Sequence, residues 1–215
     1  MPTIKRNDFD RLVRDFKFSE LFNELGWNNT SFSRNIKIED QNYPLTSIAE
    51  KNGFFVMLCE AMEMPSLPVR RQIDSAFTKV KDFHLIIYAD QAQHEQRWQF
   101  VLRAPNRPPK NIEVGWKKGQ DTEVLWQRTQ GLFFALDEEE NITIVDVTSR
   151  VTDAFSTNAE KVTKKFYDTF KKEHGQFLDF IQGIGTQVDK EWYASLMLNR
   201  LMFCYFIQKK GFLDN

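Results

Sequence analysis

The chain has 215 residues, of which 41% are hydrophobic and 14% aromatic, and its formal net charge is −1. These values allow a sizeable core and exclude a disordered chain and a globally basic nucleic-acid binder, although a local basic stripe is compatible with them. The cysteines, Cys59 and Cys204, lie in apolar runs and give neither a disulfide framework nor zinc-ligand spacing. The first residues lack the apolar region of a signal peptide, so we expect a cytoplasmic protein.

In chain order, the first part of the sequence predicts helices and strands in alternation. Apolar residues at helical spacing predict a first helix that ends at Gly26, and Asn52-Gly53 is typical of a tight hairpin turn between two strands. A polar, turn-rich stretch precedes those strands. The predicted elements are a helix over residues 7–25, strands over 43–51 and 54–60, a helix starting near Leu67, strands over 84–90, 95–104 and 112–117, and a helix over 121–134.

An acidic loop over residues 137–141 precedes a part of the chain with helical patterns alone. Helices are expected over 147–155, 159–181 and 189–210. The order of elements predicts an α/β fold, with a small mixed sheet flanked by helices and followed by an all-helical segment. We therefore expect an α/β domain over residues 1–145 and a helical connector over 146–215.

The last predicted helix is apolar almost all round, which is typical of a helix buried against something else. Asp189 is expected as its N-cap, Lys209 and Lys210 in its last turn and Gly211 just beyond its end. A membrane span is not indicated, because Asn199 and Arg200 fall in its middle, where burial in lipid is costly. The sequence thus predicts a core helix and no membrane partner.

The long helix before it has an apolar face and, on the opposite side, the five lysines Lys161, Lys164, Lys165, Lys171 and Lys172. Such a row is able to follow a phosphate backbone, so these lysines are the candidate DNA-binding residues. The alternative is a solvated surface, since Asp168 is placed to pair with Lys164 and Lys172 at i,i+4 spacing.

No phosphate-binding loop, dinucleotide-binding motif or nucleophile elbow is present, and the three histidines show no metal-ligand spacing. The helix–strand–strand–helix–strand order resembles the core of restriction-endonuclease-like nucleases. Their signature is an Asp on one strand and (Asp/Glu)-x-Lys on the next, because two carboxylates hold a divalent metal and the lysine assists the attacking water. Here the first strand offers Glu50, and the second ends in Glu60-Ala61-Met62, with Met62 in place of the lysine; Lys51 lies on the wrong strand.

Two interpretations of this incomplete signature stay open. In one, the nuclease site has decayed, or the fold is another α/β fold, and Glu50 and Glu60 have no special role. In the other, the chain is a metal-dependent nuclease with a migrated site, in which Glu50 and Glu60 act with Asp74 or Lys79 of the neighbouring helix. A divalent metal is then the required cofactor.

Two helical segments carry a further resemblance. Residues 161–184, KVTKKFYDTFKKEHGQFLDFIQGI, and the run Asn199 to Gly211, NRLMFCYFIQKKG, are similar to the region ahead of the methyltransferase domain in type IIG and type IIL restriction–modification proteins and their phage-defence relatives. The stretch HLIIYADQAQHEQRWQFVLR also resembles the amino-terminal part of some of these proteins. Together the matches cover about half of the chain.

This resemblance implies N6-adenine methylation of DNA with S-adenosylmethionine by a longer parent protein, in some members joined to DNA cleavage. The Asn-Pro-Pro-Tyr motif and the glycine-rich cofactor loop of the methyltransferase are absent from this sequence. We therefore expect a non-catalytic, DNA-directed amino-terminal module, whose partners are DNA and a downstream methyltransferase domain of the same chain. The alternative is a structural scaffold for that domain.

Overall fold

The computed structural model describes residues 4–104, 106–135, 138–139, 141–156 and 159–209, and for residues 159–166 and 209 it describes the backbone alone. The chain forms two compact units, Met1–Thr157 and Asn158–Asn215. The division therefore lies later than the boundary expected after residue 145. The reason is that α5 (Ile144–Phe155) packs its apolar side into the core of the first unit.

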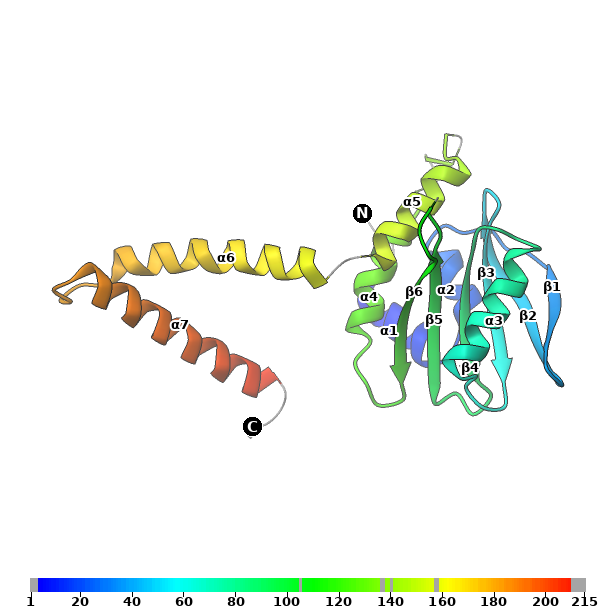
Figure 1. Ribbon diagram of the computed structural model, residues 1–215, viewed down its shortest axis with the longest axis horizontal. Helices are drawn as coiled ribbons and strands as arrows, with labels where there is room; N and C mark the ends of the chain where they lie inside the picture. The colour runs from blue at the N-terminus through cyan, green and yellow to red at the C-terminus, as the bar shows by residue number, and fades with distance from the viewer. Residues whose placement is uncertain (1–3, 105, 136–137, 140, 157–158, 210–215) are drawn as a thin grey trace. The chain divides into compact units, whose positions relative to one another are not determined.

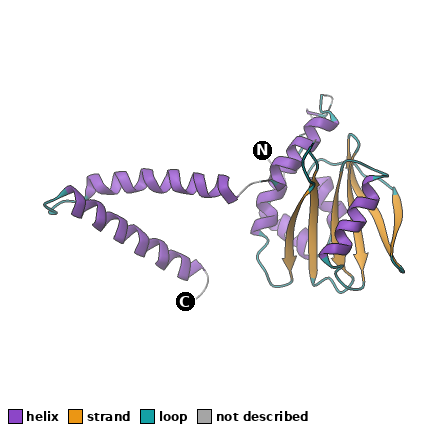
Figure 2. Ribbon diagram, viewed as in Figure 1, coloured by secondary structure: helices purple, strands orange, loops and turns teal. Residues whose placement is uncertain are grey.

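The first unit is built on a six-stranded mixed sheet whose spatial order is the order of the chain, β1 to β6 (Figures 1 and 2). Neighbouring strands are antiparallel except β3 and β4, which are parallel and are joined by a helix that crosses one face. The strands are β1 (Ser33–Ile38), β2 (Gln41–Lys51), β3 (Phe54–Ala61), β4 (His84–Asp90), β5 (Glu95–Leu102) and β6 (Lys110–Lys117).

Helices cover both faces of this sheet, which gives three layers (Figure 1). The crossover helix α3 (Leu67–Thr78) packs on one face through Ile73 and Phe77. The opposite face is covered by α1 (Arg6–Arg14), α2 (Phe18–Glu24), α4 (Glu123–Thr129) with the short 3-10 helix η1 (Gln130–Leu132), and α5. The predicted fold class, a mixed α/β sheet flanked by helices and followed by a helical segment, is confirmed.

Most of the predicted strands and turns are found at the expected residues. The strand His84–Asp90 has the predicted bounds, and its apolar run is buried on both faces. The hairpin turn at Asn52-Gly53 has both residues in the left-handed region, with φ values of 48° and 91°, as a two-residue hairpin loop requires. Gly26 follows α2 with φ of 81°, and an added Cβ would lie 2.1 Å from the Phe134 carbonyl oxygen, so only glycine fits there.

Two predicted elements are wrong. The single helix expected over residues 7–25 is two helices, because Phe16 adopts a left-handed conformation with φ of 56°. No glycine or proline marks that break. The polar stretch before residue 43 contains the strand β1, which has Ile36 as its one fully buried apolar side chain. An edge strand with a single core residue gives no alternating pattern to detect.

The main core fills the space between the sheet and the four-helix layer. Trp98 is fully buried between Phe18 and Phe22, with ring centroids 6.0 Å and 5.8 Å away. Its indole N–H donates to Gln96 Oε1 at 2.8 Å, and the Gln96 amide donates to the Val13 carbonyl at 2.9 Å. This chain of hydrogen bonds satisfies a buried carbonyl at the end of α1, where the helix is interrupted.

The second unit is a pair of helices, α6 (Ala159–Phe180) and α7 (Gln187–Lys209). Thr186, rather than Asp189, acts as the N-cap of α7: the Asp189 N–H donates to Thr186 Oγ1 at 3.1 Å, and the threonine hydroxyl donates back to the Asp189 carboxylate. Lys210, expected in the last turn, and Gly211, expected just beyond it, lie outside the described residues, as do Asp137 and Glu140 of the acidic loop.

The prediction that the last helix is a buried core helix is wrong for this chain. Among the described residues of the second unit, Ala194 and Ile181 are buried, whereas Leu201, Phe203 and Tyr205 are between 57% and 65% exposed. In the part of the chain that the structure describes, no helix combines the length and apolar character needed to cross a bilayer.

We expect Phe155→Ala to lower the free energy of unfolding of the first unit by about 3–5 kcal/mol, because it removes a fully buried ring from the main core. The control is Val145→Ala on the same helix, where the side chain is 72% exposed and the change should stay within about 0.5 kcal/mol. Urea unfolding followed by tryptophan fluorescence measures both. Equal stability of the two variants would mean that α5 does not belong to this core.

Candidate functional site

The acids predicted for a nuclease site do not converge. Glu50 is opposite Phe55 in the β2–β3 pair, and Phe55 is in turn opposite His84 at the start of β4. Glu60 lies opposite Ala89, near the other end of β4. Five residues of strand separate the two positions, which is about 17 Å. Glu50 and Glu60 therefore stand at opposite ends of the sheet and cannot share one metal ion.

Each of these acids also lacks the neighbours that a metal site needs. The Glu50 carboxylate accepts a hydrogen bond from the N–H of Gly53 in the hairpin turn. Glu60 is exposed, and its register neighbour on β4 is an alanine. Met62, which replaces the signature lysine, is 80% exposed. Within the described residues, no three His, Cys, Asp or Glu side chains form a group able to hold a metal ion.

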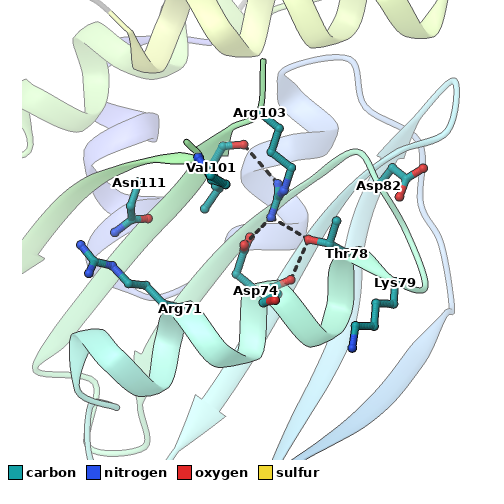
Figure 3. Close-up of a pocket in the computed structure, with 10 residues that line it drawn as sticks. Arg71, Asp74, Thr78, Lys79, Asp82, Val101, Arg103 and Asn111 are labelled. Atoms are coloured by element: carbon teal, nitrogen blue, oxygen red, sulfur yellow. Dashed lines mark hydrogen bonds and ion pairs between the residues drawn. The ribbon is translucent and has the colours of Figure 1, made fainter. Parts of the chain in front are cut away.

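Asp74, the third candidate, lies at the centre of a buried polar network between α3 and the sheet (Figure 3). Its Oδ1 is 2.9 Å from His84 Nε2, and its Oδ2 pairs with Arg103, just beyond the end of β5. The other ring nitrogen of His84 donates to the Lys81 carbonyl at 2.8 Å. Asp74 and His84 are both almost fully buried, so this carboxylate has its charge partners already and joins α3 to β4 and β5.

A cleft of about 480 Å³, named here the α3 cleft, lies beside this network. Arg71 and Ser75 of α3 and Lys79 just after it line one side, and Val101 of β5 and Asn111 of β6 line the other. Lys79 is exposed, and among the described residues no ion pair joins it to Asp74. Because Asp74 is already engaged and Lys79 lies at the rim, the pair offers no ready general acid and base.

Two further residues of this network were not among the sequence candidates. The imidazole of His84 and the guanidinium of Arg103, which also donates to Thr78 Oγ1 at 2.6 Å, complete the pairing of Asp74. Arg103 lies just beyond β5 and is exposed, yet its guanidinium reaches the buried Asp74 carboxylate. One sequence signal for this network was available. His84 is a histidine at the start of an apolar strand, and Asp74 is an aspartate beside the apolar face of a helix.

A buried cation, Lys51, lies on the other side of the sheet. Lys51 is 1% exposed; its ammonium group donates to the Gly26 carbonyl at 2.8 Å and pairs with Glu139, and it lies 5.7 Å from the centre of the Phe134 ring. These contacts hold the end of β2 against the turn after α2. We therefore assign Lys51 a structural role. It lies on β2, whereas the nuclease signature has its lysine on the following strand.

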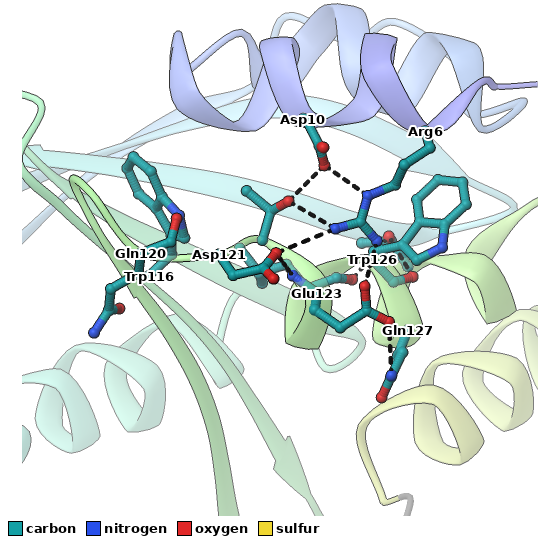
Figure 4. A network of polar contacts seen from close by, with 11 residues as sticks. Arg6, Asp10, Trp116, Gln120, Asp121, Glu123, Trp126 and Gln127 are labelled. Carbon is teal, nitrogen blue, oxygen red and sulfur yellow. Dashed lines mark hydrogen bonds and ion pairs between the residues drawn. The ribbon is translucent and has the colours of Figure 1, made fainter. Parts of the chain in front are cut away.

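Another polar network joins α1 to α4 (Figure 4). The guanidinium of Arg6 is 2.9 Å from Asp10 and 2.9 Å from Glu123, and lies 5.2 Å from the centre of the Trp126 ring. Thr122 donates its hydroxyl to Asp10. These groups satisfy one another across two helices, so we assign the network a structural role.

Burial suppresses ionisation at two other reactive side chains. It raises the pKa of the Cys59 thiol to about 12, with a smaller contribution from Glu60, so this cysteine stays protonated at neutral pH and is a poor nucleophile. Burial likewise raises the pKa of Tyr88 well above its usual value. Its phenol donates to the Arg70 carbonyl at 3.2 Å.

The candidate DNA-binding lysines all belong to α6. The side chains of Lys161, Lys164 and Lys165 lie outside the described residues. Lys171 and Lys172 are exposed, as is Asp168. The expected pairing of Asp168 with Lys172 is wrong, since no ion pair joins these two described side chains. Lys171 and Lys172 thus present their charges to solvent.

Comparison with models of known protein families, with curated proteins and with solved structures gave no match.

We expect Asp74→Asn to lower the free energy of unfolding by about 3 kcal/mol, because it removes the buried carboxylate that pairs with Arg103 and contacts the buried His84 ring. Asp82→Asn, at an exposed position of the same cleft, is the control and should change stability by no more than about 0.5 kcal/mol. Chemical denaturation measures both. A fully stable Asp74→Asn protein would contradict the structural role and return Asp74 to the list of candidate catalytic groups.

Proposed function

We propose that this chain is a non-catalytic, DNA-directed amino-terminal module of a restriction–modification-type N6-adenine DNA methyltransferase. The observation that carries the proposal is that Glu50 and Glu60, the acids of the nuclease-like sequence pattern, lie at opposite ends of the sheet. A fold of this kind keeps a surface suited to DNA while lacking the paired carboxylates that metal-dependent cleavage needs. S-adenosylmethionine and the methyl-transfer chemistry belong, in this proposal, to the downstream domain.

The DNA-directed part rests on α6. Lys171 and Lys172 are adjacent, exposed and not paired with Asp168, so two positive charges are open to phosphate oxygens. Phosphate contacts by lysine supply affinity without sequence preference. Recognition of a particular DNA sequence would then depend on other parts of the parent protein.

The partner of α7 is proposed to be the downstream methyltransferase domain. Contacts with α6 bury Ala194, yet Trp192, Leu201 and Phe203 remain more than half exposed. Exposed apolar side chains on several sides of a helix suit contact with a protein partner. This surface equally supports the second candidate function, a structural scaffold for that domain without any contact to DNA.

The metal-dependent nuclease with a migrated site is not favoured by any observation here. Its four proposed residues are divided between two ends of the sheet, and Asp74 is engaged by His84 and Arg103.

We expect the chain to bind duplex DNA with an affinity that falls steeply as salt rises. Lys171→Gln/Lys172→Gln should make the slope of log affinity against log salt shallower by about 2, since each lost phosphate contact removes about 0.9. Fluorescence anisotropy over a salt series measures the slope. The control removes two exposed lysines of the first unit, Lys37→Gln/Lys110→Gln, and should leave it unchanged. Absence of binding by the native chain at low salt would remove the DNA-directed function and favour the scaffold.

For α7, we expect Leu201→Lys/Tyr205→Lys to reduce the binding of an apolar dye such as ANS and any self-association. The two side chains are a helical turn apart and both are exposed. Lysine is a good helix former, so circular dichroism should stay unchanged. The control, Asn199→Lys/Gln208→Lys, adds the same charge at exposed polar positions of the helix. Equal dye binding by native chain and both variants would mean that α7 offers no docking surface.

A further inference from the structure

A second group of basic side chains meets in the first unit. Arg14 at the end of α1, Lys17 before α2 and Lys118 after β6 line one cleft of about 670 Å³, named here the basic cleft. The turns after β4 and β6 contribute Gln93 and Gly119 to its wall. Two segments far apart in sequence, the junction of α1 with α2 and the turn after β6, thus bring three cations to one hollow in the surface.

The charge of the basic cleft is not cancelled locally. Asp15 is the carboxylate that lines it, and Lys17 makes a loose contact of 4.0 Å with Glu20. Over the described residues, no ion pair engages Arg14 or Lys118, and both side chains are exposed. By contrast, the α3 cleft contains two carboxylates, and its Arg103 is already paired. Of the two, the basic cleft is therefore the better site for an anion.

The position of the basic cleft connects it with the nuclease-like edge of the sheet. The turn after β4 is anchored to the end of β3, where the Gln91 N–H donates to the Ala61 carbonyl at 2.9 Å. Glu60, next to Ala61, occupies the strand end at which the nuclease signature would place its carboxylate. The three cations accordingly lie at the end of the sheet that corresponds to the missing catalytic edge.

The chemistry of the wall distinguishes a phosphate backbone from unpaired bases. Bases of single strands need an exposed aromatic face for stacking. Trp116, the aromatic residue that lines the cleft, is 3% exposed, and its indole N–H donates to the Gln120 carbonyl at 3.0 Å (Figure 4). With its ring covered, the cleft offers charge and polar groups, which suit phosphates whose bases remain paired.

We propose that the basic cleft binds phosphates of duplex DNA and is a contact separate from the lysines of α6. The proposal rests on the DNA-directed function given above and adds a second site to it. Arg14 and Lys118 are assigned direct phosphate contacts, and Lys17 a supporting one.

The test compares three variants of the full chain in one anisotropy assay on a duplex over a salt series. Arg14→Gln/Lys118→Gln should make the salt slope shallower by about 2 and weaken binding at 0.1 M salt by about tenfold or more, since contacts from charged donors are strong. The control is Arg71→Gln/Lys79→Gln, which removes two exposed cations from the α3 cleft and should leave the slope as it is. Lys171→Gln/Lys172→Gln completes the set.

The outcomes separate this inference from the proposed function. An effect confined to the Arg14/Lys118 and Lys171/Lys172 variants supports both. An effect of the Lys171/Lys172 variant without any effect of the Arg14/Lys118 variant overturns the basic cleft and leaves the function standing. Equal losses in the Arg14/Lys118 and Arg71/Lys79 variants overturn the basic cleft as well, because they show a response to net charge.

A native chain that does not bind DNA overturns the proposed function itself. Tighter binding of a single strand than of its duplex would contradict the assignment to paired DNA.

Discussion

The arrangement of α3 on the sheet depends on the polar contacts of one buried carboxylate, that of Asp74. Taking a charge out of water is costly unless its partners are close and well oriented. Here His84 and Arg103 approach the two oxygens from different strands. Since Asp74 belongs to the crossover helix, these contacts fix α3 over β4 and β5 and thereby shape the α3 cleft. The group that resembles a catalytic acid by residue type is, by its contacts, the attachment point of a helix.

The parallel pairing of β3 with β4 has a consequence for chemistry. The end of β3, which carries Glu60, lies beside the end of β4. The start of β4 is about 17 Å away, and there His84 contacts Asp74 of α3. The geometry of the sheet itself thus keeps Glu60 away from Glu50 and Asp74. Small side-chain movements cannot bring Glu50, Glu60 and Asp74 to one metal, so metal-dependent cleavage by these residues would require new carboxylates at one strand end.

The two units make different contributions to the proposed module. The first has its own core on both faces of the sheet and carries the basic cleft. The second is a helical hairpin, and among its described side chains large apolar ones such as Leu201, Phe203 and Tyr205 of α7 are exposed. Charge on the first unit and on α6 suits DNA, whereas exposed apolar side chains suit a protein domain. This division of surface chemistry fits a connector between DNA and a catalytic domain.

The sequence by itself determined the class of the fold, most strands and the helical character of the last part, because these follow from local periodicity and turn residues. His84–Asp90 has the predicted bounds for that reason. Two features that depend on a single residue were not predicted from the sequence. The break between α1 and α2 depends on the backbone conformation of Phe16, and the strand β1 has one core side chain. Burial of α7 was also mispredicted, since an apolar helix indicates a need for a partner and not where that partner lies.

Only the tertiary structure decided that Glu50 and Glu60 are apart, that Asp74 is paired, and that Arg14 and Lys118 share a cleft. Distances between residues far apart in the chain are set by strand register and helix packing, which no local pattern encodes.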